Sequence, residues 1–325
     1  MNARRRILIA AAVSALAGSR AAIAQARLRK IAFLGGGNAE TDEPGLAAFR
    51  GGMAERGWVE GRDYRFEARY AEGVAERLPD LAASLIATKP DLILTTSEPP
   101  ASALIRQTKI PVVFAIARDP VGTGLAASLQ RPGGTATGLI TFAPELSAKR
   151  VQLLREAFPN LSHVAALHST DDPIGPAQAR EIEQAARALG MRFSSIQIAG
   201  PADVDPAFER IAVLKADGVI VTSGVITSTS RKAIVGAAAR ARIPAIYPFD
   251  IFTAEGGLLS YGTRRTENYR RAAEYADKIL KGAVPGEMAI QQPNLVDLVV
   301  NRGAAKAQGF SIPNSLMLQA TSVIE

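Results

Sequence analysis

One pattern of landmarks occurs twice along the chain, and this repetition restricts the fold more than any other feature. The segment DLILTTS at residues 91–97 has the same outline as DGVIVTS at residues 217–223, which lies 126 positions later. Gly57 and Gly190 each follow a stretch of helical periodicity, and they lie 133 positions apart. A nearly constant offset across separate landmarks indicates two similar domains in succession. The length of 325 residues also suits two domains.

Each half alternates short apolar runs with longer amphipathic stretches. The expected strands are 30–35, 64–70, 92–96 and 112–116 in the first half, and 164–168, 192–198, 219–222 and 245–249 in the second. The expected helices include 46–56, 79–88, 176–189 and 228–242. This alternation is typical of a parallel sheet with helices on both faces. We therefore predict an α/β protein with two doubly wound parallel-sheet lobes.

The chain continues well beyond the second half. Residues 258–261 and 295–300 read as strands, and residues 267–281 read as a long helix between them. A tail of this length can return to the first lobe, so we expect several segments to cross between the lobes as a multi-strand hinge that permits closure about a ligand. The expected boundaries are 27–142 and 257–300 for lobe 1, and 143–256 and 301–325 for lobe 2.

The first 24 residues have the three parts of a secretory signal. Arg4, Arg5 and Arg6 precede an apolar stretch at residues 7–17, and Ala22-Ile23-Ala24 is a small-x-small cleavage site. The apolar stretch is too short to span a bilayer core of about 30 Å as a helix. We predict a signal peptide at residues 1–24 and export to the periplasm, by either the Sec or the twin-arginine route.

The charge of the chain depends strongly on this segment. The formal net charge of the whole chain is +7, but four arginines and no acid lie in the first 24 residues. The remainder is only weakly basic, so a nucleic-acid partner is not expected. The sequence also contains no cysteine, which excludes disulfides, thiol nucleophiles and zinc-thiolate sites.

No motif of a cofactor site or of an enzyme is present. The turn Gly35-Gly36-Gly37 lacks the dinucleotide fingerprint, because Glu40 stands where a third glycine is required. The two histidines, His163 and His168, point to opposite faces of one expected strand and cannot share a metal. No Gly-x-Ser-x-Gly or His-Glu-x-x-His motif occurs. We expect no cofactor, no metal and no catalysis.

The candidate ligand-binding residues follow the expected strands. Ligands of open α/β sheets bind outside the carboxyl ends of the strands, so a site between two facing lobes is expected. The candidates are Asn38, Ser97, Glu98, Ala101, Arg118 and Asp119 in the first lobe, and Ser169, Asp171, Ser223, Gly224, Thr227, Phe249 and Asp250 in the second.

These candidates carry both signs of charge. Arg118 and the helix N-termini favour a carboxylate, whereas Asp171 and Asp250 favour an ammonium group, so a zwitterion such as an amino acid fits. Phe249 could pack against an apolar side chain of that solute. The alternative is that Asp119 and Asp250 cap local turns, and that Arg118 pairs with Glu98 or Asp119.

Five segments together form a specific pattern, namely PVVFAIARDPVGTGL at 111–125, RPGGTATGL at 131–139, PELSAKRVQLL at 144–154, GGLLSYG at 256–262 and LVVNRGAAKAQGFSIP at 298–313. With this pattern the chain resembles ABC-transporter substrate-binding proteins of the tryptophan/tyrosine type. The resemblance implies a type 1 periplasmic-binding fold and delivery of a small solute to a membrane permease driven by an ATPase. Arg118 departs from the pattern, because the family usually has Gly or Thr before this Asp-Pro, and the resemblance therefore does not identify the solute.

Three functions are consistent with these observations. The first is a monomeric, exported solute-binding protein that closes around one solute and works with a permease and an ATPase. The second is a periplasmic α/β enzyme acting on a small polar substrate. The third is a sensory ligand-binding protein.

Overall fold

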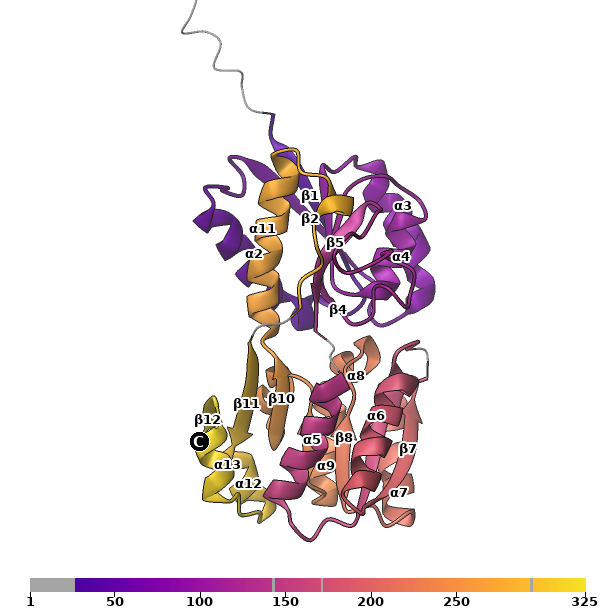
Figure 1. The fold of residues 1–325 in the computed structure, drawn as a ribbon, viewed down its shortest axis with the longest axis vertical. Coiled ribbons are helices and arrows are strands. Elements are labelled where there is room, and N and C mark those ends of the chain that lie inside the picture. The colour runs from indigo at the N-terminus through magenta and orange to yellow at the C-terminus, as the bar shows by residue number, and fades with distance from the viewer. Residues whose placement is uncertain (1–26, 142–143, 171, 293–294) are drawn as a thin grey trace, which may run out of the picture.

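Two α/β lobes are stacked along the long axis of the molecule (Figure 1). The computed structural model describes residues 27–141, 144–170, 172–292 and 295–325. The predicted signal peptide at 1–24 lies outside the described residues. The prediction of two sheet-based lobes is confirmed.

The sheet of the first lobe has five parallel strands in the order β2-β1-β3-β4-β5. Their bounds are Arg29–Gly35 (β1), Tyr64–Tyr70 (β2), Leu92–Thr95 (β3), Val112–Ala117 (β4) and Ala136–Ile140 (β5). The sequence did not predict β5, because Gly138 interrupts a short run. Gly138 has φ of 148°, and a Cβ there would lie 2.0 Å from the carbonyl oxygen of Phe114 on β4. This strand pair therefore requires glycine.

The sheet of the second lobe has seven strands in the order β12-β11-β10-β9-β8-β6-β7. Their bounds are His163–Ser169 (β6), Arg192–Ile198 (β7), Gly218–Val221 (β8), Ala245–Tyr247 (β9), Leu259–Thr263 (β10), Val296–Asn301 (β11) and Ser322–Ile324 (β12). Strands β10 and β11 pair antiparallel, and the other neighbours pair parallel.

The tail differs from the expected lobe boundaries. We expected residues 257–300 in lobe 1, but β10 and β11 extend the sheet of the second lobe, with Leu259 opposite Ile246 of β9 and Val300 of β11. This placement pairs the edge of β9, which would otherwise carry free backbone groups. Only the part between these strands lies on the first lobe, where the Gln291 backbone N–H donates to the Gly138 carbonyl oxygen at 3.0 Å. The chain thus crosses between the lobes after β5, after β10 and before β11 (Figure 1).

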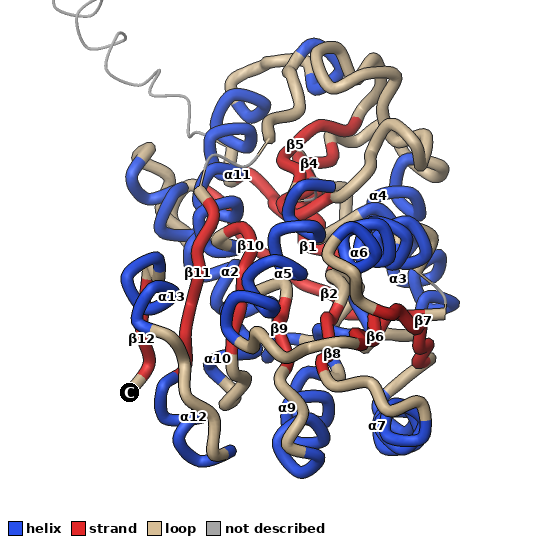
Figure 2. Tube along the Cα trace, turned by 60° about the horizontal axis from the view of Figure 1, so that its bottom comes forward, coloured by secondary structure: helices blue, strands red, loops and turns tan. Residues whose placement is uncertain are grey.

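Helices cover both faces of each sheet (Figures 1 and 2). Their bounds are Ala39–Glu55 (α2), Leu78–Ala87 (α3), Glu98–Ile105 (α4), Pro144–Ala157 (α5), Gly175–Ala188 (α6), Val204–Val213 (α7), Val225–Thr229 (α8), Arg231–Ala241 (α9), Asp250–Ala254 (α10), Arg265–Leu280 (α11), Arg302–Gln308 (α12) and Asn314–Gln319 (α13). Each lobe contains two apolar clusters of buried residues.

Two glycines of α2 allow this helix to lie directly against α11. A Cβ on Gly45 would come within 2.6 Å of the Tyr269 ring, and a Cβ on Gly52 would come within 2.6 Å of the Arg270 carbonyl oxygen. Helix axes can approach this closely only where side chains are absent. The contact holds the N-terminal turns of both helices next to each other at the lower end of the first lobe (Figure 1).

Candidate ligand-binding site

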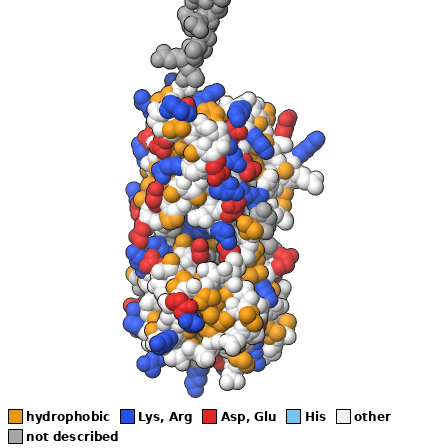
Figure 3. Space-filling model, turned by 90° about the vertical axis from the view of Figure 1, so that its left-hand side faces the viewer, with side chains coloured by type: hydrophobic (Ala, Val, Ile, Leu, Met, Phe, Trp, Pro, Cys, Tyr) orange, Lys and Arg blue, Asp and Glu red, His pale blue; other side chains and the backbone are white. Residues whose placement is uncertain are grey.

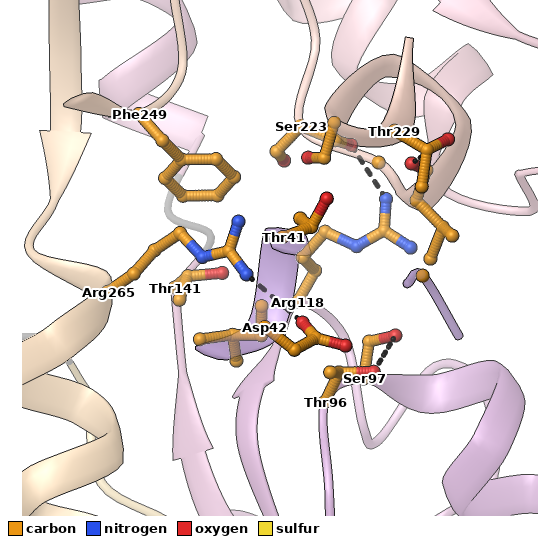
Figure 4. Close-up of a pocket in the computed structure, with 15 residues that line it drawn as sticks. Thr41, Asp42, Thr96, Ser97, Arg118, Thr141, Ser223, Thr229, Phe249 and Arg265 are labelled. Carbon is orange, nitrogen blue, oxygen red and sulfur yellow. Dashed lines mark hydrogen bonds and ion pairs between the residues drawn. The ribbon is translucent and has the colours of Figure 1, made fainter. Parts of the chain in front are cut away.

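A pocket lies between the lobes, at the carboxyl ends of the parallel strands. Its atom-free space, with the open solvent at its mouth included, is about 450 Å³. The lining residues are Gly37, Thr41, Asp42, Thr96, Ser97, Ile116, Arg118 and Thr141 of the first lobe, Ser223, Gly224, Val225, Ser228, Thr229 and Phe249 of the second, and Arg265 at the start of α11 (Figure 4).

Asp42 and Arg265 face each other in this pocket (Figure 4). Asp42 lies in the first turns of α2, Arg265 is the first residue of α11, and Asp42 Oδ1 lies 3.5 Å from Arg265 Nη2. The two side chains are buried, but Asp42 Oδ2 and Arg265 Nη1 have no hydrogen-bond partner among the described residues. The Arg265 guanidinium also lies over the Phe249 ring, 5.4 Å from its centre, which orients the cation.

Burial changes the acidity of Asp42. Removal from water raises the pKa of this carboxyl to about 7, although Arg265 acts to lower it and Glu72 raises it further. Near neutral pH a positive group entering the pocket would therefore shift Asp42 to the ionised form. An unpartnered buried acceptor and donor are each energetically costly. Both costs are relieved by a ligand that supplies an ammonium group and a carboxylate.

Arg118 is committed to other contacts. It follows β4, and its Nη1 donates to Asp172 Oδ2 and, at 2.8 Å, to the Ser223 carbonyl oxygen of the second lobe. Its Nε lies 3.6 Å from Glu98 Oε2. Burial alone would lower the pKa of Arg118, but the nearby Asp172 and Glu98 raise it above its ordinary value. Arg118 thus pairs with Glu98, as one interpretation of the sequence expected, and in addition with Asp172.

The structure places only some of the predicted site residues at the pocket. The structure brings five of them to the pocket, namely Ser97, Arg118, Ser223, Gly224 and Phe249. Ser169 lines a neighbouring chamber together with Arg118. Asp250, at the start of α10, lines neither space, and Asp171 lies outside the described residues.

The other predicted residues have structural contacts. Asn38 caps α2 by accepting from the Thr41 backbone N–H at 2.9 Å. Ala101 is fully buried in an apolar cluster. Glu98 accepts from the backbone N–H groups of Arg118 and Asp119. The Thr227 hydroxyl donates to the Thr222 carbonyl oxygen at 3.0 Å. Asp119 is exposed and accepts from the Gly122 backbone N–H at 2.8 Å, which matches the turn-cap alternative.

Three charged residues were not among the predicted site residues, namely Asp42, Asp172 and Arg265, although the sequence places Asp172 at the end of an expected strand. Asp42 was overlooked because helix α2 was expected to begin at residue 46, whereas it begins at Ala39 and includes Pro44. The available signal was Asn38, a helix-capping residue directly before an acidic run. Arg265 was overlooked because the tail was assigned no role in the site.

Basic and acidic side chains are interspersed over both lobes on the face shown in Figure 3. That face therefore carries no large patch of one sign of charge. Among the described residues, no helix combines the length and the apolar character that crossing a bilayer requires.

Two lobes of mostly parallel sheet, joined by several crossings and with a pocket between them, define a bilobed ligand-binding protein of the type 1 periplasmic-binding fold. Residues 42–324 match the family described as ABC transporter substrate binding protein. The chain belongs to this family. Its members are substrate-binding proteins of ABC transporters.

Known relatives agree with this assignment. The tyrosine-binding protein of Clostridioides difficile is 23% identical over 257 residues, which cover 78% of this chain and 73% of that protein. A conserved domain protein of Vibrio cholerae superposes with a TM-score of 0.86 at 26% identity, covering 91% of this chain and 100% of the other. An ABC domain of Streptococcus pneumoniae in complex with L-Trp superposes with a TM-score of 0.84 at 22% identity, covering the same shares of both chains.

Proposed function

We propose that this protein is the exported solute-binding component of an ABC importer and that it holds one zwitterionic solute, an amino acid or a close relative, between its lobes. The observation that carries the proposal is the pair of unpartnered buried atoms in one pocket, Asp42 Oδ2 and Arg265 Nη1. In this arrangement the ammonium group of the solute binds Asp42, and its carboxylate binds Arg265. This assignment replaces Arg118 as the carboxylate partner, because Arg118 is held by Asp172 and Ser223.

The rest of the pocket favours an apolar or aromatic side chain on the solute. Ile116, Val225 and Phe249 line it beside the charged pair. A relative is a tyrosine-binding protein, and a structural neighbour was solved with L-Trp. Aromatic amino acids are therefore the first solutes to test. The predicted signal peptide would direct the mature protein to the periplasm, where it would deliver the solute to a permease coupled to an ATPase.

Native mass spectrometry of protein purified without denaturation identifies a retained solute, and calorimetry with the twenty amino acids measures affinity. Asp42→Asn and Arg265→Gln should each weaken binding of that solute by roughly ten- to a hundredfold, because a buried hydrogen bond to a charged group contributes about 1.5 to 3 kcal/mol. Asp119→Asn is the matched control, since Asp119 is exposed and outside the pocket. Binding within twofold of wild type in both pocket variants would refute this use of the pocket.

A further inference from the structure

The cleft between the lobes contains a second chamber next to the pocket. Its atom-free space, with the open solvent at its mouth included, is about 750 Å³, and its lining includes Gly73, Leu78, Ser169 and Ile226. Arg118 and Val225 line both spaces. They therefore form the partition between the pocket, which contains Asp42 and Arg265, and the chamber.

Arg118 is the charged part of this partition, and both lobes hold it in place. Asp172 accepts a hydrogen bond from the Arg118 guanidinium. Asp172 is itself oriented by accepting from the Ile174 backbone N–H at 3.0 Å. The Ser223 carbonyl oxygen accepts from Arg118 at 2.8 Å and from Gln178 Nε2 at 2.9 Å. A buried cation with fixed acceptors resists displacement, because moving it leaves buried carboxylates without a partner.

Val225 closes the rest of the partition against a glycine of the opposite lobe. A Cβ on Gly36 would lie 3.2 Å from Val225 Cγ2, so the first-lobe backbone and this side chain are already in close contact. Three charged residues are among the described residues that line the chamber: Arg118 and Asp172, which pair with each other, and Glu76, which is exposed. The chamber can therefore hold the extension of a solute anchored in the pocket, but only if the partition opens.

We infer that Arg118 is a specificity-determining residue that limits the solute to the length of the inner pocket. The inference rests on the proposed function, because it takes the charged groups of the solute to be held by Asp42 and Arg265. In wild type the partition excludes amino acids whose side chains would have to enter the chamber. Rejection by a fixed obstacle is a standard source of selectivity.

The test uses pairs of amino acids that share their charged groups and differ in side-chain length. The pairs are L-tyrosine and O-benzyl-L-tyrosine, L-phenylalanine and 4-phenyl-L-phenylalanine, and L-serine and O-benzyl-L-serine. The main variant is Arg118→Ala/Asp172→Asn, which removes one charge of each sign. The carboxamide introduced in place of the Asp172 carboxylate would still accept from the Ile174 backbone N–H, and Glu98 keeps its two backbone donors.

Two further variants distinguish a partition that limits the solute from a contact that only joins the lobes. Val225→Ala thins the partition without changing a charge, and it is informative if the double variant fails to fold. Arg231→Ala is the matched control. Arg231 binds Glu40 at 2.9 Å and the Thr41 hydroxyl at 2.9 Å across the cleft, but it lines neither space.

The expected result is that wild type binds a short member and excludes its long partner. The double variant should bind the long member about tenfold or more tighter than wild type does. Val225→Ala should also bind the long member tighter than wild type does, but by a smaller factor. Arg231→Ala should weaken both members of a pair equally. Two results would refute the role of the partition. One is that the double variant changes the affinities for both members of a pair by the same factor, and the other is that wild type binds both members with equal affinity. If wild type binds neither a short member nor any other amino acid, the proposed function itself is refuted.

Discussion

Replacing Asp42 with asparagine should remove a pH-dependent penalty from the folded protein. Burial raises the pKa of Asp42 from its ordinary value of 3.8 to about 7. Well below pH 3.8 the carboxyl is protonated in both the folded and the unfolded chain and exerts no effect. As the pH rises from about 4 to about 7, the unfolded chain ionises freely while the folded chain does not, so stability falls.

The size of the effect follows from the two pKa values. The interval between 3.8 and about 7 corresponds to about 4 kcal/mol of stability lost above pH 7. Between pH 5 and pH 8 the ligand-free wild type should therefore lose about 3 kcal/mol relative to Asp42→Asn, which does not titrate there. Other groups titrate in both proteins and cancel in the comparison.

The chain contains a suitable probe for this measurement. Trp58 is the single tryptophan, it lies in the first lobe with Asp42, and its Nε1 donates to Asp277 Oδ1 of α11 at 2.8 Å. Urea unfolding followed by tryptophan fluorescence thus reports the lobe that contains the substitution. If the stability difference between wild type and Asp42→Asn is the same at pH 5 and pH 8, Asp42 does not titrate near neutrality and the reasoning fails.

Three other predictions follow from the structure and the sequence. At pH 6, binding of an amino acid should release up to one proton, because its ammonium group lowers the pKa of Asp42. Calorimetry in buffers of different ionisation enthalpy measures the number of protons released, and equal binding heats in all buffers would contradict the prediction. Gly45→Ala should destabilise the first lobe by about 1–3 kcal/mol, since its Cβ would meet the Tyr269 ring at 2.6 Å. The control Gly51→Ala, with no atom within 4 Å of the added Cβ, should be neutral or stabilising by about 1 kcal/mol in urea unfolding. Amino-terminal sequencing of the exported protein should begin at or near Gln25, and an intact Met1 would exclude cleavage.

The sequence by itself determined the architecture of each lobe. Four strands in each half were predicted within a few residues, because apolar runs and glycine helix stops are local signals, whereas β5 was not predicted. The duplication of DLILTTS and DGVIVTS indicated two similar lobes before any contact was known. The carboxyl-end rule for parallel strands also placed Ser97, Ser223 and Phe249 at the pocket.

Only the tertiary structure decided which charges meet. Asp42 and Arg265 are separated by more than two hundred residues, and they face each other because Gly45 and Gly52 let α2 lie against α11. Arg118 was recognised as a candidate, but its partner Asp172 belongs to the other lobe. The tail strands β10 and β11 likewise joined the sheet whose edge was free. Such pairings depend on complementary surfaces brought together by packing, and periodicity along one chain carries no information about them.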